Sequence, residues 1–357
     1  MERRRRFDDR AGEEAGVQLS DLVDRIPDDR RERARIALSA VFGRSPVTSL
    51  EPITSGASAA SYRIEVGGRP YLLRLESCRR DEVRDPYRAY VCMQAAAAAG
   101  VAPAVRHADP AAAVAITDFV SECPLSDYAG GTAAVVRDLG GLVARLQAIP
   151  AFPPVFDYPS MIGILLGRLL DSGLFVPGLL DRHREGFERI REAYRWDSET
   201  LVSSHNDLNP GNILFDGNRL WLVDWETAYG NDPLVDVATL STFFAAAPEL
   251  EVALLRSWLG REPGRLVRAR LGLMRQLVRL FYGCAASLNA ANTPAGMVPA
   301  TDLSTFTREQ FRDAITQGRL IAGSPEAQRI VGKMALANFL ARLATPEFEE
   351  ALVVARG

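Results

Sequence analysis

The chain of 357 residues contains little lysine, few cysteines and no long apolar run. Lys333 is the only lysine, so almost all of the 42 basic side chains are arginines, and 45 acidic residues leave a net charge of −3 at pH 7. Because there is no uniform positive charge to hold a nucleic-acid backbone, we expect no nucleic-acid partner. No segment reaches the about 18 apolar residues that a membrane helix needs, so we also expect no association with a membrane.

The cysteines and histidines are too scattered to predict a zinc site. They are Cys78, Cys92, Cys123, Cys284, His107, His183 and His205. No two of the cysteines form a CxxC pair, so we expect reduced, mostly buried thiols. The arginine-rich start is followed by acidic residues and not by an apolar signal segment, which favours a cytoplasmic location. The composition leaves the oligomeric state open.

Hydrophobic periodicity predicts an α+β fold with two lobes. We expect a charged tail over residues 1–18, an N-terminal lobe with leading helices over 19–120, and a C-terminal lobe over 121–357. In the first lobe, alternating residues on both sides of Gly67-Gly68 predict a β-hairpin, since a glycine pair accepts the positive φ of a tight turn. The predicted elements of this lobe are helices within 19–43, strands over 61–66, 69–75 and 114–120, and a helix over 82–99.

The second lobe is predicted to be mainly helical, with one polar interruption. Helical periodicity begins near residue 126 and continues through the stretches 159–171, 178–195, 234–245, 248–260, 263–290, 307–317 and 325–355. The interruption, residues 201–232, is rich in Asn, Asp, Gly and Pro and contains two short apolar runs, 213–215 and 220–223. Polar residues around two short strands indicate a functional site on a rigid scaffold.

The polar interruption brings together residues suited to phosphoryl transfer. If its two apolar runs pair as a hairpin, Asn212 and Asp224 lie about one strand spacing apart. A carboxylate and an amide oxygen, with room for water and phosphate oxygens, suit Mg²⁺. Asp207 lies on the loop that leads into the hairpin, where a carboxylate can accept or orient the proton of a substrate hydroxyl.

These residues resemble the aminoglycoside phosphotransferase and choline kinase superfamily, whose members are relatives of protein kinases. The matching pattern is H-x-D-x-x-x-x-N, formed by His205, Asp207 and Asn212, followed by Asp224 in an Asp-Trp-Glu sequence. The resemblance implies a protein-kinase-like bilobal fold, a small antiparallel N-lobe that binds ATP, and a helical C-lobe that binds the acceptor. It also implies that Asp207 is the catalytic base, that Asn212 and Asp224 hold Mg²⁺, and that Asp236 braces the catalytic loop. We expect a structural role for His205.

The same resemblance predicts the nucleotide contacts of the first lobe. The segment 54–62 should form the phosphate loop, with Gly56 and Ser58 as contacts, and the connector from Asp118 to Val120 should meet the adenine. Arg74 takes the place of the family's strand lysine. An arginine keeps the charge but changes the geometry of phosphate binding. The helix acid that pairs with this cation is not obvious, and we favour Asp85.

The acceptor is expected to be a small molecule with a hydroxyl group. Trp225, Glu226 and Asp232 follow the predicted metal site closely, and carboxylates beside aromatic rings suit a cationic amino-alcohol or an aminoglycoside. Further aromatic residues that could line the pocket or pack in the core are Tyr229, Phe243, Phe244, Trp258, Phe281 and Tyr282. A neutral sugar or a small alcohol stays open as the acceptor.

Two other functions are compatible with parts of this pattern. A pseudo-kinase that binds nucleotide as a regulatory module would agree with Arg74 and the missing helix acid. A protein kinase is disfavoured because residues 225–238 leave little room for an activation loop and contain no A-P-E-type sequence. The complete set of Asp207, Asn212 and Asp224 favours a small-molecule kinase.

Overall fold

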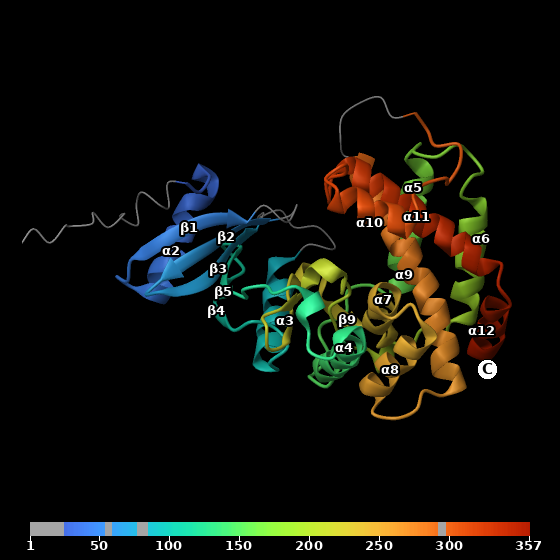
Figure 1. Cartoon of the computed structure of the whole chain (residues 1–357), viewed down its shortest axis with the longest axis horizontal. Helices are drawn as coiled ribbons and strands as arrows, with labels where there is room; N and C mark the ends of the chain where they lie inside the picture. The colour runs from blue at the N-terminus through green and yellow to red at the C-terminus, as the bar shows by residue number, and fades with distance from the viewer. Residues whose placement is uncertain (1–24, 54–58, 77–84, 292–297) are drawn as a thin grey trace, which may run out of the picture. The chain divides into compact units, whose positions relative to one another are not determined.

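The computed structural model describes residues 25–53, 59–76, 85–291 and 298–357. The chain divides into a smaller unit, residues 1–80 and 104–119, and a larger unit, residues 81–103 and 120–357. The predicted tail over 1–18 and the predicted phosphate-loop residues Gly56 and Ser58 lie outside the described residues. The antiparallel sheet of the smaller unit and the helices of the larger one confirm the predicted α+β class (Figure 1).

The described residues of the smaller unit form a five-stranded antiparallel sheet with one helix packed on it (Figure 1). The strand order is β1-β2-β3-β5-β4. The elements are α2 (Asp28–Phe42), β1 (Val47–Ile53), β2 (Ala59–Val66), β3 (Arg69–Glu76), β4 (Val105–Asp109) and β5 (Val114–Asp118). Leu38 of α2 packs with Ile64, Leu73 and Ile116 of the sheet in one buried core. The burial of these side chains holds the helix on the sheet.

The predicted hairpin of the smaller unit is confirmed. Strands β2 and β3 pair in unbroken register from Ala59 opposite Glu76 to Val66 opposite Arg69. Gly67 and Gly68 have φ angles of 59° and 71°, the left-handed values that a two-residue turn requires. Strands β1 and β4, which the sequence analysis did not predict, complete the sheet on either side.

The larger unit contains ten α-helices and four short strands among its described residues. The helices are α3 (Pro86–Ala98), α4 (Gly131–Gln147), α5 (Tyr158–Asp171), α6 (Asp181–Ala193), α7 (Leu234–Phe244), α8 (Pro248–Leu259), α9 (Arg265–Ala291), α10 (Arg308–Thr316) and α11 (Pro325–Leu343), followed by a tenth, α12 (Pro346–Arg356), at the C-terminus. The strands are β6 (Val202–Ser204), β7 (Ile213–Phe215), β8 (Leu220–Leu222) and β9 (Tyr229–Asn231). Among the described residues no helix is long and apolar enough to cross a membrane.

Helix α3 belongs to the larger unit, whereas the sequence analysis placed it in the first lobe. Arg88 donates a hydrogen bond to the backbone oxygen of Glu226 (3.0 Å), and the Cys92 thiol donates one to the backbone oxygen of Ala228 (3.6 Å). These contacts attach α3 to the segment that follows Asp224. The helix is therefore part of the scaffold of the candidate site.

The predicted helix over 325–355 is two helices, α11 and α12. Thr345 is extended, with ψ at 148°, and Pro346 follows it as the first residue of α12. A proline disfavours the helical conformation of the residue before it, so the chain turns at this position. The periodicity on both sides is helical, which is why the sequence pattern alone predicted one continuous helix.

Helices α9 and α11 lie side by side in close contact (Figure 1). A Cβ atom added to Gly332 of α11 would lie 2.3 Å from the Ser287 hydroxyl oxygen and 3.2 Å from the backbone oxygen of Gly283, both on α9. The backbones approach because glycine has no side chain here. By contrast, a Cβ atom added to Gly272 of α9 would meet only Ala351, at an ordinary 3.9 Å.

We predict opposite effects for alanine at these two helical glycines. Gly332→Ala should lower the free energy of unfolding by about 1–3 kcal/mol, because the added methyl group forces the helices apart. Gly272→Ala should leave it unchanged or raise it by up to about 1 kcal/mol, since alanine favours a helix. Thermal unfolding followed by circular dichroism compares the two variants. Equal stability of both would contradict the close packing at Gly332.

Candidate active site

The candidate site is built on two short strand pairs of the larger unit. Strands β6 and β9 pair, and β7 pairs with β8 in the predicted hairpin, with Ile213 opposite Leu222. The backbone N–H of Val223 donates to the oxygen of Asn212 (3.0 Å), which extends the ladder by one step. The segments that carry Asn212 and Asp224 therefore lie next to each other, as the sequence predicts. Residues 205–212 form the loop between β6 and β7.

The buried carboxylate of Asp236 holds the start of this loop. Its two oxygens accept the backbone N–H groups of His205 and Asn206, each at 2.8 Å. Asp236 lies in the first turn of α7 and has no exposed surface. Burial raises the pKa of Asp236, and its interaction with His205 and the two amide hydrogen bonds act in the opposite direction. The resemblance implied that Asp236 braces the catalytic loop, and these two hydrogen bonds support that prediction.

Asn206 fixes the turn at which the chain leaves β6. Its φ angle is 66°, a left-handed value that asparagine tolerates better than most residues. Its side-chain nitrogen donates to the backbone oxygen of Thr227 (2.9 Å), and its side-chain oxygen accepts from Asn231 (2.6 Å). The sequence analysis assigned no role to Asn206 or Asn231. Their partners lie more than 20 residues away, so local pattern gave no signal for them.

His205, for which a structural role was predicted, lies in the core of the larger unit. The ring is fully buried, its Nε2 lies 2.9 Å from the backbone oxygen of Val223, and it packs on Trp225 with 4.7 Å between ring centroids. Trp225 is itself only 5% exposed and meets the ring of Phe152 edge to face. Trp225 was predicted as a possible substrate contact, and its burial favours a core role instead.

The Asp207 carboxylate, the predicted base, is held by three side chains. Its Oδ1 accepts from Asn209 Nδ2 (3.0 Å) and from the Tyr282 hydroxyl (2.5 Å). Its Oδ2 accepts from Asn212 Nδ2 at a longer 3.3 Å, while the same nitrogen donates to the backbone oxygen of Asp207 at 2.8 Å. Oδ1 thus has two strong donors, and Oδ2 is the oxygen with more capacity left for a substrate hydroxyl.

Tyr282 is a site residue that the sequence analysis noted only as aromatic surface. It projects from α9, 75 residues after Asp207, and its ring packs edge to face on Phe243 and Phe281 at centroid distances of 5.1 Å. Burial and the neighbouring Asp207 charge raise the pKa of Tyr282 well above its usual value. The phenol therefore stays protonated and keeps donating to Asp207.

Asn212 and Asp224 offer the oxygen ligands that were predicted for magnesium. Because the Asn212 nitrogen donates to Asp207, its amide oxygen faces away from that carboxylate. Asp224 has a left-handed φ of 66° and precedes the short 3₁₀ turn Trp225–Thr227. The described residues contain no group of three or more His, Cys, Asp or Glu that could hold a metal. One amide oxygen and one carboxylate would suit a hard cation that takes its remaining ligands from water and phosphate, and the magnesium site stays a prediction.

Asp232 is occupied by protein partners, although it was predicted as a substrate contact. It is 2% exposed and accepts from the Tyr194 hydroxyl (2.9 Å), from Arg270 (3.0 Å) and from the backbone N–H of Leu234 (2.8 Å). Burial raises the pKa of Asp232, and the contact with Arg270 opposes that shift. This network favours a structural role. Of the two carboxylates predicted to contact the acceptor molecule, Glu226 is the one that is partly exposed.

In the smaller unit, Arg74 forms an ion pair with Glu76 on the same strand. Arg74 Nε lies 3.1 Å from the Glu76 carboxylate, and both side chains are largely buried. Glu76 was not considered as the partner in the sequence analysis. Asp85, which was, belongs to the larger unit and caps α3 by accepting from the backbone N–H of Tyr87 (3.0 Å).

The predicted connector spans the end of the smaller unit and the start of the larger one. Asp118 ends β5, and its carboxylate pairs with Arg106 through two hydrogen bonds of 2.6 and 2.8 Å. The backbone N–H of Asp118 donates to the backbone oxygen of Ala104 (2.9 Å). Val120 is partly buried and is the first residue of the second segment of the larger unit. Adenine contact by this connector stays a prediction.

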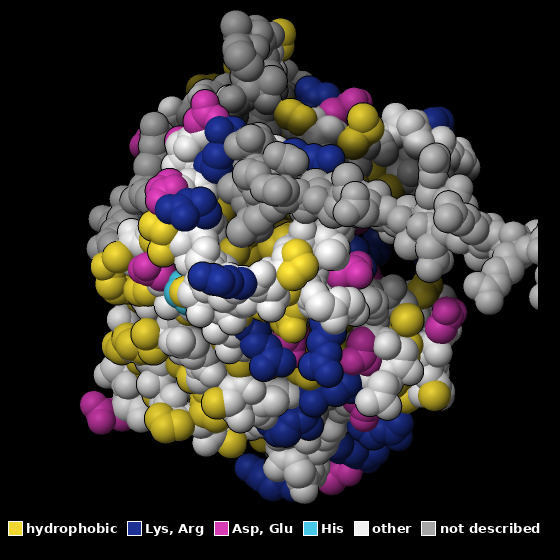
Figure 2. Space-filling view, turned by 90° about the vertical axis from the view of Figure 1, so that its left-hand side faces the viewer, with side chains coloured by type: hydrophobic (Ala, Val, Ile, Leu, Met, Phe, Trp, Pro, Cys, Tyr) yellow, Lys and Arg dark blue, Asp and Glu magenta, His cyan; other side chains and the backbone are white. Residues whose placement is uncertain are grey.

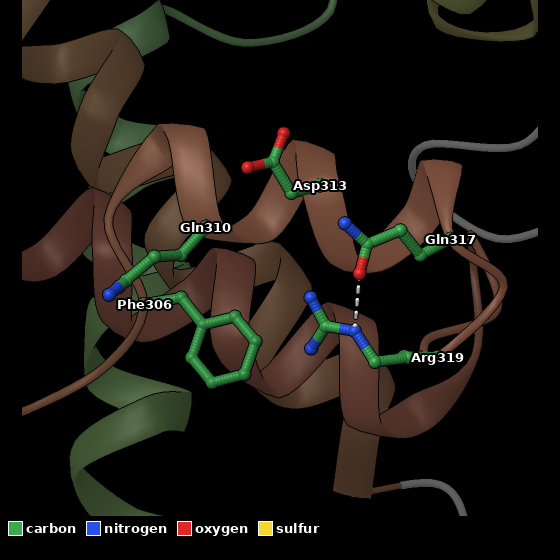
Figure 3. Close-up of a pocket in the computed structure, with 5 residues that line it drawn as sticks. All are labelled: Phe306, Gln310, Asp313, Gln317 and Arg319. Carbon is green, nitrogen blue, oxygen red and sulfur yellow. Dashed lines mark hydrogen bonds between the residues drawn. The ribbon is translucent and has the colours of Figure 1, made fainter.

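A separate cavity lies on α10, away from the predicted site residues. It has a volume of about 410 Å³ and is lined by Phe306, Gln310, Asp313, Gln317 and Arg319. Figure 3 shows the Arg319 side chain linked to Gln317, a hydrogen bond of 2.9 Å, with Asp313 pointing away from both. None of the predicted site residues lines this cavity, so it does not compete with the Asp207 cluster as the candidate active site.

The described surface charges are mixed in sign. Arginine and acidic side chains lie among one another on the face shown in Figure 2. Examples among the described residues are the pairs of Arg63 with Glu51 and of Arg189 with Glu349. Exposed pairs of this kind contribute little to stability, and they leave neighbouring charges of opposite sign close together.

The chain has a kinase-like phosphotransferase fold. Its smaller unit contains the sheet, and its larger unit is helical and carries Asp207, Asn212 and Asp224. Residues 49–269, more than half of the chain, match the model of the phosphotransferase enzyme family, and the chain belongs to this family.

Solved structures with the same fold come from choline and ethanolamine kinases. A choline/ethanolamine kinase family protein from Mesorhizobium loti has a TM-score of 0.64 and 22% identity, covering 91% of this chain and 98% of that chain. Choline kinase LicA from Streptococcus pneumoniae has a TM-score of 0.60 and 12% identity, covering 88% and 99%. A LicA structure in complex with AMP, at the same identity and coverage, has a TM-score of 0.56.

The curated relatives match only a short part of the chain. Protein LicA of Haemophilus influenzae is 53% identical over 40 residues, which is 11% of this chain and 15% of LicA. An uncharacterized protein of Metamycoplasma hominis is 34% identical over 77 residues, 21% of this chain and 15% of that protein. The chain thus spans about a seventh of the length of these relatives.

We predict that Tyr282→Phe lowers kcat for phosphoryl transfer by about 10-fold, because Asp207 loses its shortest hydrogen bond while the aromatic packing is kept. The KM for ATP should stay within about twofold. Tyr158→Phe is the matched control, since this buried hydroxyl has no hydrogen-bond partner among the described residues. Steady-state assays of ADP release measure both variants. A wild-type kcat in Tyr282→Phe would show that the contact does not position the base.

Proposed function

We propose that this protein is an ATP-dependent phosphotransferase that moves the γ-phosphate to a hydroxyl of a small molecule. The observation that carries the proposal is the convergence of Asp207, Asn212 and the Asp224 segment, with the loop between them held by Asp236. Membership of the phosphotransferase enzyme family supports it. Phosphoryl transfer needs chiefly positioning and charge neutralisation, which such a cluster supplies.

Asp207 acts as the base in this proposal. Asn209 and Tyr282 orient its carboxylate through Oδ1, so that Oδ2 accepts the proton of the acceptor hydroxyl as the oxygen attacks the γ-phosphorus. Phosphoryl transfer leaves ADP as the second product. Asn212, which contacts Oδ2 at 3.3 Å, fixes the distance between the base and the metal ligands.

Asn212 and Asp224 are the residues that would hold Mg²⁺ with the nucleotide. A bound magnesium ion neutralises charge on the phosphate oxygens. The protein's part is to present one amide oxygen and one carboxylate from adjacent segments, which suits an ion that keeps several water and phosphate ligands. Arg74 is proposed to contribute a phosphate contact, and the AMP complex of LicA supports nucleotide binding for this fold.

The acceptor class is the finer part of the proposal. The choline and ethanolamine kinases of the same fold support an amino-alcohol, and the sequence analysis also considered an aminoglycoside. Of the two carboxylates expected to attract a cation, Asp232 is neutralised by Arg270, so only Glu226 remains.

A catalytically weak pseudo-kinase is the alternative. It would keep nucleotide binding without turnover. The hydrogen bonds that orient Asp207 disfavour it, because a chain that only binds nucleotide has no need for a positioned base. The missing acidic partner of Arg74 was one reason for considering a pseudo-kinase, and the ion pair with Glu76 removes that reason.

We predict that Asp207→Asn lowers kcat by roughly 10²–10⁴-fold with little change in nucleotide affinity, because the amide cannot accept the proton. ADP release with Mg-ATP is measured across choline, ethanolamine, aminoglycosides and amino sugars. Turnover in Asp207→Asn equal to wild type would show that the base is misassigned. Wild-type turnover no faster than hydrolysis for every acceptor would favour the pseudo-kinase.

We predict that Asp224→Ala abolishes the magnesium-dependent part of ATP binding, because Asn212 alone supplies no negative charge. Isothermal titration calorimetry with ATP, in the presence and absence of Mg²⁺, measures this. Asp216→Ala is a suitable control, since this aspartate lies on the β7–β8 turn and bonds to Trp221 (2.7 Å). Intact Mg-ATP affinity in Asp224→Ala would contradict the metal assignment.

A further inference from the structure

Two arginines lie on the helix that carries Tyr282 and a third lies on the adjacent helix, whereas the sequence analysis expected carboxylates near the acceptor. Arg275 and Arg279 lie on α9, and Arg342 lies on the adjacent α11. Arg275, Arg279 and Tyr282 are at positions i, i+4 and i+7, so they share one face of α9. Tyr282 on that face contacts the base, and at 1.5 Å per residue Arg279 and Arg275 follow it at about 5 and 10 Å along the helix.

The cluster formed by Arg275, Arg279 and Arg342 has little negative charge near it. Glu251 of α8 is the one acid that acts on Arg275 and Arg279 among the described residues. Its carboxylate is already engaged, since it pairs with Arg275 and also accepts from the Ser241 hydroxyl (3.0 Å). Arg275 and Arg279 thus share a single carboxylate, which also accepts from the Ser241 hydroxyl.

Arg279 is left without a partner among the residues that the structure describes. Its Nη1 atom is buried and makes no hydrogen bond to them. Burial, together with repulsion from Arg275 and Arg342, lowers the pKa of Arg279 to about 9. A guanidinium group that is taken out of water without a compensating anion destabilises the folded protein, so it is maintained only where it serves another purpose.

The surroundings connect this cluster to the acceptor side of the site. Phe243, whose ring packs on Tyr282, is the second-last residue of α7, two residues beyond the Ser241 that binds Glu251. A further arginine, Arg308 of α10, donates to the backbone oxygen of Phe243 (3.4 Å). Aromatic surface next to the base is therefore bordered by positive charge.

We propose that Arg279, with Arg275 and Arg342, forms an anion site that binds a phosphate or carboxylate group of the acceptor alcohol. This inference rests on the proposed phosphotransferase function and specifies its substrate class as an alcohol with an acidic group. A guanidinium group binds either anion through paired hydrogen bonds. The hydroxyl would lie at Asp207 while the acidic group lies farther along α9, within the span of a small organic molecule.

The first test measures the anion site directly. Inorganic phosphate is titrated into the full-length protein by calorimetry in saturating Mg-ADP, so that the nucleotide's own phosphate contacts are occupied. Arg279→Gln should weaken phosphate binding at least 10-fold. Arg261→Gln, a change at an exposed arginine on the loop before α9, should have no effect. Equal affinity of Arg279→Gln and wild type would overturn the inference.

Thermal unfolding separates a binding role from a structural one. Arg279→Gln should keep or raise the Tm, because the variant removes a charge that no described residue neutralises. A lower Tm combined with unchanged phosphate affinity would assign Arg279 to the fold and overturn the inference.

The second test separates this inference from the proposed function. ADP formation is compared for glycerol 3-phosphate, glycerate, glycerol and choline. Wild type should have a higher kcat/KM for the two anionic alcohols than for glycerol, and Arg279→Gln should reduce that preference at least 10-fold. Faster turnover of choline in both proteins would overturn the inference and keep the proposed function. ADP formation from none of them, and from none of the acceptors tested with Asp207→Asn, would overturn the proposed function, and phosphate affinity would then decide the anion site.

Discussion

The candidate site depends on one buried carboxylate that accepts two backbone amides. Asp236 holds the N–H groups of His205 and Asn206, and through them it fixes where the loop to Asp207 begins. A carboxylate without exposed surface is costly unless its lone pairs are filled. Here the loop fills them, so the loop conformation and the burial of the charge depend on each other. Asn206 then joins the same loop to the strand that precedes α7.

The parts of this arrangement that are local in the chain could be read from the sequence. The hairpin at Gly67-Gly68 and the strand pair that brings Asn212 toward Asp224 follow from spacing over a few tens of residues, whereas the role of Asp236 was implied by the family resemblance. The break between α11 and α12 was missed because helical periodicity continues across it. Contacts between distant segments left no such pattern, and Tyr282, 75 residues from Asp207, was therefore noted only as an aromatic residue.

Charge was the property that sequence proximity predicted least well. Asp232 lies close to the metal segment in the chain, yet in the fold it faces Tyr194 and Arg270. Conversely, Arg279 is far from the motif in sequence and lies one helical turn from Tyr282. The sign of the charge near an acceptor is set by which helix faces pack together, and only the tertiary structure determines that.

The close approach of α9 and α11 at Gly332 has a mechanical consequence. Interlocked backbones resist sliding, so α9 behaves as a stiff rod whose two ends cannot shift independently. Because one face of that rod carries both the phenol beside Asp207 and the arginines farther along, a lengthwise displacement of α9 would disturb both at once. Turnover rate and acceptor choice are thus coupled through a single rigid helix. Substitutions where α9 and α11 meet at Gly332 should alter both together.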